Sequence, residues 1–112
     1  MNAETHFDSD AIKIDSVDFR LRPRFRDAAL SKASALFRRH SELLGLLVKL
    51  RRKETGNAVS EFSATVRLVL PGYDRVVVKR GNQLAAVIAE ALEVADRQLR
   101  RRARALRASV RA

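Results

Sequence analysis

A series of arginines near the C-terminal end of the sequence has the residue type and spacing to bind a polyanion. At about 100° per residue of an α-helix, these side chains fall within an arc of roughly 120° on one face. No acidic residue follows Asp96, so nothing in this segment neutralises them. A guanidinium can hold phosphate oxygens through two parallel hydrogen bonds. The pattern therefore predicts an anion-binding face, although a solvated, frayed helix end remains the alternative. The arginines are Arg97, Arg100, Arg101, Arg104, Arg107 and Arg111.

A long final helix over residues 82–111 is needed to align these arginines. Its apolar residues recur every three or four positions, which is the spacing of one helical face. Gly81 ends the preceding segment, and Asn82 is a suitable N-cap residue. The predicted buried face consists of Leu84, Ile88, Ala91, Leu92, Ala95, Leu99, Ala103 and Leu106.

Composition favours an anionic partner. The 112 residues carry a formal net charge of +10, and the pI is about 11.3. The charge is uneven, because the first 18 residues hold five acids and only one base, Lys13. Nucleic acid is the first expectation and a membrane surface is the second. The hydrophobic content of 46% is enough for one core and one small domain.

Several classes of protein are disfavoured. The sequence has no cysteine, which excludes disulfides and thiolate metal sites and fits a cytoplasmic location. It shows neither a secretory signal nor an apolar run long enough to cross a bilayer. His6 and His40 lie in different elements without a spaced metal-binding or nucleophilic partner, and we expect His40 to interact with a helix dipole. The acids Glu90, Glu93 and Asp96 are interpreted as members of a surface ion-pair network. We therefore expect no enzyme, metal, cofactor or small-molecule substrate.

The order of elements predicts an α+β fold. Period-two alternation indicates strands, helical spacing indicates helices, and Pro23 suits the first turn of a helix. Residues 54–57 and 71–74 are interpreted as turns, and residues 1–10 as a flexible acidic N-terminus. The expected result is a β-α-β-β-β-α two-layer sandwich, a four-stranded sheet with two helices packed on one face. Its strands are 12–19, 44–51, 62–70 and 76–78, and its helices are 23–40 and 82–111.

Further basic residues lie on the predicted strands. Lys49 and Arg51 alternate with apolar residues, and Lys79 follows the fourth strand. They extend the basic surface across the open sheet face, or they keep an edge strand soluble. Aromatic residues are few, and most of the five phenylalanines are in phase with a core. We therefore do not expect a base-stacking platform for single-stranded nucleic acid.

The sequence resembles the ribosome hibernation factors, also called the sigma-54 modulation or ribosome-associated inhibitor family. The order of elements, Gly81 before the last helix, and Arg97-Gln98-Leu99 followed by a basic run carry the resemblance, which spans roughly residues 12–106. Leu84 and Ile88 match the family's pattern at the start of that helix. The chain departs from it where Gln83, Ala85 and Ala89 replace an acid, a tyrosine and a second acid, and where Ala103 and Ala105 replace spaced lysines. It therefore resembles a divergent member, and its end soon after the helix corresponds to the short form.

The resemblance implies a function. Such proteins bind the small ribosomal subunit near the decoding region, contact its rRNA, block mRNA and tRNA, and preserve idle ribosomes in starvation or stationary phase. Residues 11–112 are then a single ribosome-binding domain. The alternatives are a general RNA- or DNA-binding accessory protein without ribosome specificity, and a module that binds a membrane surface or another protein through the basic helix. The implied rRNA-binding residues are Arg97, Arg100, Arg101, Arg104, Arg107, Lys49, Arg51 and Lys79.

Overall fold

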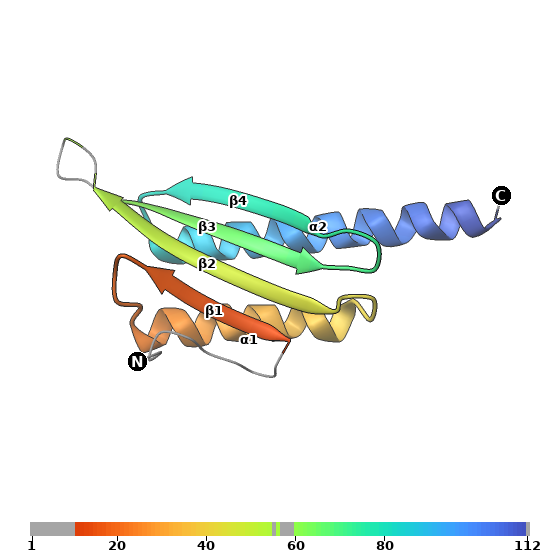
Figure 1. Cartoon of the computed structure of the whole chain (residues 1–112), viewed down its shortest axis with the longest axis horizontal. Helices are drawn as coiled ribbons and strands as arrows, with labels where there is room; N and C mark the ends of the chain where they lie inside the picture. Colours follow the sequence, from red (N-terminus) through yellow and green to blue (C-terminus); the bar gives the residue numbers. More distant parts are fainter. Residues whose placement is uncertain (1–10, 55, 57–59, 112) are drawn as a thin grey trace.

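Six elements follow one another in the predicted order, and Figure 1 shows their arrangement. The structure, a computed structural model, describes residues 11–54, 56 and 60–111. The expected N-terminal segment 1–10 and part of the expected 54–57 turn lie outside the described residues. The elements are β1 (Ile12–Val17), α1 (Pro23–Arg39), β2 (Gly45–Glu54), β3 (Ser60–Val69), β4 (Arg75–Gly81) and α2 (Leu84–Arg111).

The four strands form one mixed sheet in the order β1-β2-β3-β4. β1 and β2 are parallel, so the chain must cross over between them, and α1 makes that crossover. β2, β3 and β4 are successive antiparallel neighbours. Gly72, with a φ of 96°, supports the turn between β3 and β4, a conformation that a residue with a Cβ rarely adopts.

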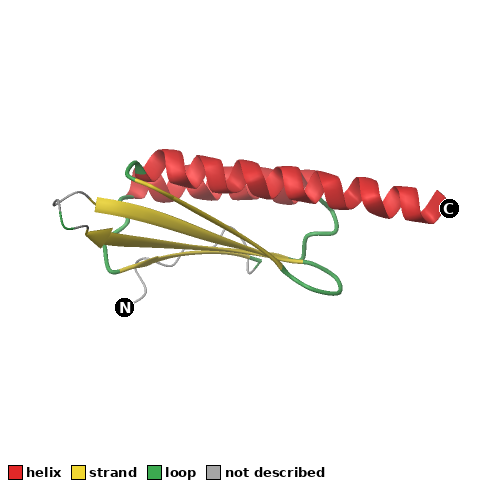
Figure 2. Ribbon diagram, turned by 90° about the horizontal axis from the view of Figure 1, so that it is seen from above, coloured by secondary structure: helices red, strands yellow, loops and turns green. Residues whose placement is uncertain are grey.

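Both helices cover the same face of the sheet, as predicted, and Figure 2 shows the two layers from the side. α1 packs against β1 and α2, and α2 lies over β3 and β4. The alternation of apolar residues in the strands decides which face is buried. Ile14, Leu46, Val66 and Leu99 are among the side chains that are fully buried between the layers. The predicted α+β two-layer fold is confirmed.

The start of α1 follows from its proline. Pro23 occupies the first helical turn, where its missing N–H leaves no hydrogen bond unmade. A residue before proline is restricted to extended backbone, and Arg22 has φ −72° and ψ 148°. Arg38 and Arg39 lie in the last turn, where positive charge suits the helix dipole.

α2 is longer than the sheet that it covers. Its 28 residues span about 42 Å, and its C-terminal turns project beyond the other elements (Figure 1). Leu106 was predicted to lie on the buried face, but it is 49% exposed because the sheet ends before it. Two smaller expectations are also corrected. The second strand was expected to begin at Leu44, but β2 begins at Gly45 and Leu44 is exposed. Asn82 was expected to be the N-cap residue, but the carbonyl of Gln83 accepts the first helical hydrogen bond, from the N–H of Val87.

Candidate nucleic-acid interface

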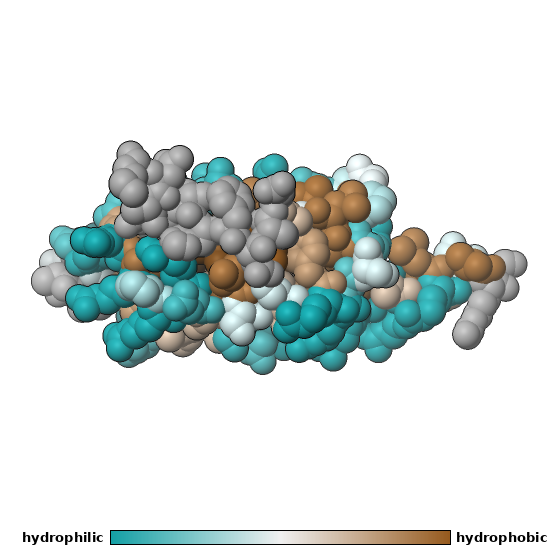
Figure 3. Space-filling view, turned by 90° about the horizontal axis from the view of Figure 1, so that it is seen from below, coloured by the Kyte–Doolittle hydropathy of each residue, from teal (hydrophilic) through white to brown (hydrophobic). Residues whose placement is uncertain are grey.

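A basic groove of about 480 Å³ lies between the C-terminal end of α1 and the second half of α2. Its walls carry arginine side chains from both helices, and no acidic residue lines it. Figure 3 shows hydrophilic side chains running along the helical layer towards the C-terminal end of α2. We call this surface the arginine groove. It is lined by Arg39, His40, Arg97, Arg100, Arg101, Ala103, Arg104 and Arg107.

The groove collects all five of the α2 arginines that were predicted to bind rRNA. Their positions follow from the helix alone, because positions three or four apart share one face. Four of these arginines are exposed and form no ion pair with any residue that the structure describes. They are Arg97, Arg101, Arg104 and Arg107. Their charges are therefore available to an anionic partner.

A polar contact joins the two helices beside the groove. His40, which follows α1 and is 6% exposed, lies with Nε2 2.8 Å from Oδ1 of Asp96 on α2. The other carboxylate oxygen of Asp96 lies 3.3 Å from a terminal nitrogen of Arg39 and 3.3 Å from one of Arg100. Asp96 thus fixes the position of one arginine from each helix.

The surroundings of Asp96 stabilise its charged form. Burial by itself would raise the pKa of this carboxyl. The hydrogen bond from His40 and the positive charges of Arg100 and Arg39 outweigh that effect, so the pKa of Asp96 is lowered. The carboxylate is therefore ionised at neutral pH and neutralises part of the charge at this end of the groove.

This contact corrects the expectation for His40. We expected His40 to interact chiefly with the dipole of its helix, but its ring binds a carboxylate 56 positions away. The expected ion-pair network does exist for Asp96 and Glu90, which pairs with Lys79 at 3.6 Å. Glu93 forms no ion pair with the part of the chain that the structure describes.

The other three predicted rRNA-binding residues lie elsewhere. Lys49 and Arg51 are exposed and alternate along β2 with the buried Val48 and Leu50, so they lie on the face of the sheet opposite the helices. Lys79 pairs in register with the buried Ala64, so it faces the helical layer, and Glu90 of α2 neutralises it. We expected Lys79 to extend the basic surface of the open sheet face, and that prediction is wrong. The predicted rRNA-binding residues therefore lie in three places: the arginine groove, the open sheet face, and the side of β4 that faces the helices.

The open sheet face is basic and partly apolar. The register places Arg51, Ser63 and Arg80 side by side across three strands. Exposed Val76 and Val78 lie on the same face of β4. This face is a second basic surface, separate from the arginine groove.

Arg39 is the groove arginine that the sequence did not identify. It lies on α1, and nothing in its local spacing links it to arginines more than 50 positions later. Only the packing of α1 against α2 brings them together.

No group of three or more histidines, cysteines or acids in residues 11–54, 56 and 60–111 is placed to hold a metal ion. Within the same ranges, no helix is both long and apolar enough to cross a membrane.

Comparison with known proteins gives one family. Residues 12–107 match the family described as sigma 54 modulation protein / S30EA ribosomal protein. The match covers every element except the last few residues of α2. No curated protein matches the sequence.

Solved structures of other proteins share this fold. The N-terminal domain of Protein Y from Thermus thermophilus has a TM-score of 0.61 and 22% identity, over 79% of this chain and 92% of that one. A ribosomal subunit interface protein from Coxiella burnetii has a TM-score of 0.64 and 11% identity, over 80% and 93%. At these identities the likeness concerns the fold.

Proposed function

Because the chain belongs to the sigma 54 modulation protein / S30EA ribosomal protein family, we propose that it is a ribosome-associated translation inhibitor of the hibernation type. In this proposal it binds the small ribosomal subunit near the decoding region. The arginine groove contacts rRNA there, and the bound domain occupies the path of mRNA and tRNA. This places its action in the cytoplasm, where ribosomes work.

The observation that carries the proposal is the convergence of arginines from two helices on one groove. Structured RNA presents mainly phosphates, 2′-hydroxyls and shape, because the deep major groove of its helices hides the base edges. Guanidinium groups suit phosphates, since each offers two parallel donors. A groove with several arginines and no acid on its walls is therefore suited to an RNA backbone.

Lys49 and Arg51 give the proposal a second contact region. They lie on the open sheet face, which the helices leave uncovered. Because the arginine groove and the open sheet face lie on different sides of the molecule, the domain can contact two separate segments of rRNA at once. We propose that this face meets a second segment of rRNA while the groove holds the first. Lys79 is not part of this contact, because Glu90 neutralises it.

The salt dependence of binding tests the role of the groove. The four unpaired groove arginines should contribute about −3 to −3.6 to the log–log salt slope, at about 0.7 to 0.9 per phosphate contact, and contacts on the open sheet face add to that value. Replacing Arg97, Arg101 and Arg104 by Ala should make that slope shallower by about 2 to 3 and weaken binding to small subunits. Alanine preserves the helix, so circular dichroism should be unchanged.

A matched control removes the same charge from a different surface. Arg24, Lys32 and Arg38 are exposed on α1 and do not line the groove. Their triple replacement by Ala should leave the slope nearly unchanged. Equal losses for the two triple variants would contradict a specific role for the groove. The position on the ribosome is tested by chemical footprinting, in which protection of rRNA outside the decoding region would contradict the proposed location.

A further inference from the structure

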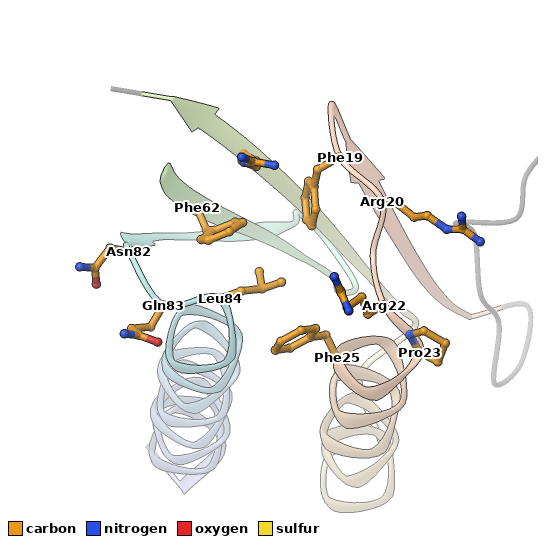
Figure 4. Close-up of a pocket in the computed structure, with 10 residues that line it drawn as sticks. Phe19, Arg20, Arg22, Pro23, Phe25, Phe62, Asn82, Gln83 and Leu84 are labelled. Carbon is orange, nitrogen blue, oxygen red and sulfur yellow. The ribbon is translucent and has the colours of Figure 1, made fainter. Parts of the chain in front are cut away.

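A hollow lies at the end of the sandwich opposite the projecting tip of α2. It has a volume of about 740 Å³, within the range of small-ligand sites in proteins. Figure 4 shows the side chains of Phe19, Phe25, Phe62 and Leu84 pointing into a common space between the sheet and the first turns of the two helices. We call this space the phenylalanine hollow.

Three aromatic rings thus meet from three separate segments. Phe19 and Phe62 contact each other edge to face, with ring centroids 5.7 Å apart. All three rings are only partly buried, although phenylalanine gains most from complete burial. The Arg24 guanidinium covers one face of the Phe25 ring, 4.7 Å from its centroid, so the hollow offers the remaining ring faces and edges to another planar ring.

The backbone before α1 directs Phe19 towards this space. β1 ends at Val17, and Asp18 has a φ of 70°, a left-handed conformation that aspartate tolerates better than most residues. The segment is then fixed by the buried side chain of Leu21, whose carbonyl accepts a hydrogen bond of 3.1 Å from the Arg26 guanidinium. The position of Phe19 is thus built into the fold.

The charged lining of the hollow is basic. Three arginines line it, and no acidic side chain does so among the described residues. Arg52 is already engaged, because its Nε donates to Ser60 Oγ and a terminal nitrogen donates to Glu54. Arg22 projects into the space beside Phe25 (Figure 4), and no described residue forms a hydrogen bond or ion pair with its guanidinium. Its charge is therefore free to meet a negative group held against the rings.

We infer that the phenylalanine hollow binds one nucleotide unit, with the base packed against the phenylalanine rings and the phosphate beside Arg22. The combination of aromatic surface and unpaired guanidinium fits a planar ring that carries an anion, and it fits neither a neutral lipid nor a cationic ligand. The unit is either a free mononucleotide or an unpaired residue of an RNA strand. The inference goes beyond the proposed function, because the hollow is separate from the arginine groove and shares no residue with it.

NMR of phenylalanine rings gives the direct test, since the chain has only five phenylalanines. Adenosine and guanosine monophosphates should shift the ring signals of Phe19, Phe25 and Phe62 in a saturable way. Phe37, which lies near the other end of α1, should not shift. Adenosine without phosphate and ribose 5-phosphate without a base should each bind about tenfold more weakly or worse.

Variants decide whether the shifts report this site. Arg22→Gln should weaken mononucleotide binding about tenfold, whereas Arg38→Gln, the same change at the far end of α1, should leave it unchanged. Phe25→Leu should weaken it similarly while keeping an apolar side chain. Equal effects of Arg22→Gln and Arg38→Gln would overturn the inference.

A second arm distinguishes the two sources of the nucleotide. A single-stranded RNA hexamer that binds while mononucleotides do not, and that loses affinity with Arg22→Gln, would support an RNA residue as the occupant. A hexamer of abasic residues should then bind no better to the wild type than to the Phe25→Leu protein. Absence of saturable ring shifts with both mononucleotides and the hexamer at several millimolar would overturn the inference. Loss of ribosome binding in the groove variants, with these shifts retained, would separate the two sites.

Discussion

Replacing Asp96 by Asn is expected to lower stability and to strengthen RNA binding at the same time. The carboxylate accepts a 2.8 Å hydrogen bond from His40 and is 13% exposed, so it is an anchor between the two helices. A hydrogen bond to a charged group contributes about 1.5 to 3 kcal/mol to stability. The ion pairs with Arg39 and Arg100 add little, because both arginine side chains are at least 60% exposed. The amide oxygen of the Asp96→Asn variant still accepts a neutral hydrogen bond from His40, which is worth about 0.5 to 1.5 kcal/mol, so we expect the free energy of unfolding to fall by about 1 to 1.5 kcal/mol.

The same change raises the positive charge beside the arginine groove. Arg39 and Arg100 lose the carboxylate that neutralises them, and the local charge rises by one. The salt slope for RNA binding should become steeper by about 0.7 to 0.9 for each additional phosphate contact. Urea denaturation gives the stability, and binding to small subunits at several salt concentrations gives the slope.

Glu93→Gln is the matched control for Asp96→Asn. Glu93 lies on the same helix, is exposed, and forms no ion pair with the described residues. This substitution makes the same change in net charge, and it should alter stability by no more than about 0.5 kcal/mol. If the Asp96→Asn and Glu93→Gln proteins unfold at the same urea concentration, the reasoning about the helix anchor is refuted.

Two further predictions concern stability. The pKa of Asp96 is lowered in the folded protein, so its contribution is fully present above the unfolded-state value of about 3.9 and is lost as pH falls through the lowered value. The stabilities of the wild type and the Asp96→Asn protein in urea should therefore begin to converge as pH falls below about 4 and meet only below the lowered pKa of Asp96, and a constant difference down to pH 2 would contradict this. Leu99→Ala should lower the free energy of unfolding by about 2 to 5 kcal/mol, because Leu99 is fully buried. Leu106→Ala, two turns later on the projecting part of α2, should lower it by less than about 1 kcal/mol. Similar costs for the two leucines would mean that the end of α2 is covered in solution.

The fold was predictable because its patterns are local. Period-two alternation identified the strands, and Pro23 marked the start of α1. The period of α2 also determined which arginines share a face. The end of the buried stripe was harder to place, because periodicity does not reveal where the sheet stops. The ten residues of β3 span about 34 Å, shorter than the length of α2, and the excess exposes Leu106.

The parts of the site that sequence reasoning missed depend on tertiary packing. Arg39 joins the groove, and His40 binds Asp96, only because α1 and α2 lie side by side. Lys79 was assigned to the open face, but its cross-strand partner Ala64 is buried, so it faces the helices. The phenylalanine hollow was missed for the same reason. Phe19, Phe25 and Phe62 are in phase with apolar neighbours, and nothing in their spacing shows that their rings meet at an open end of the core.

Co-sedimentation with ribosomes in the presence of competitor tests the central claim most directly. The purified protein is mixed with small subunits at moderate salt, together with an excess of tRNA and duplex DNA. The proposed function predicts that it continues to migrate with the small subunits, because an assembled rRNA surface engages the groove and the open sheet face together. Complete removal by the competitor would contradict the claim and would make the arginine groove a general polyanion-binding surface.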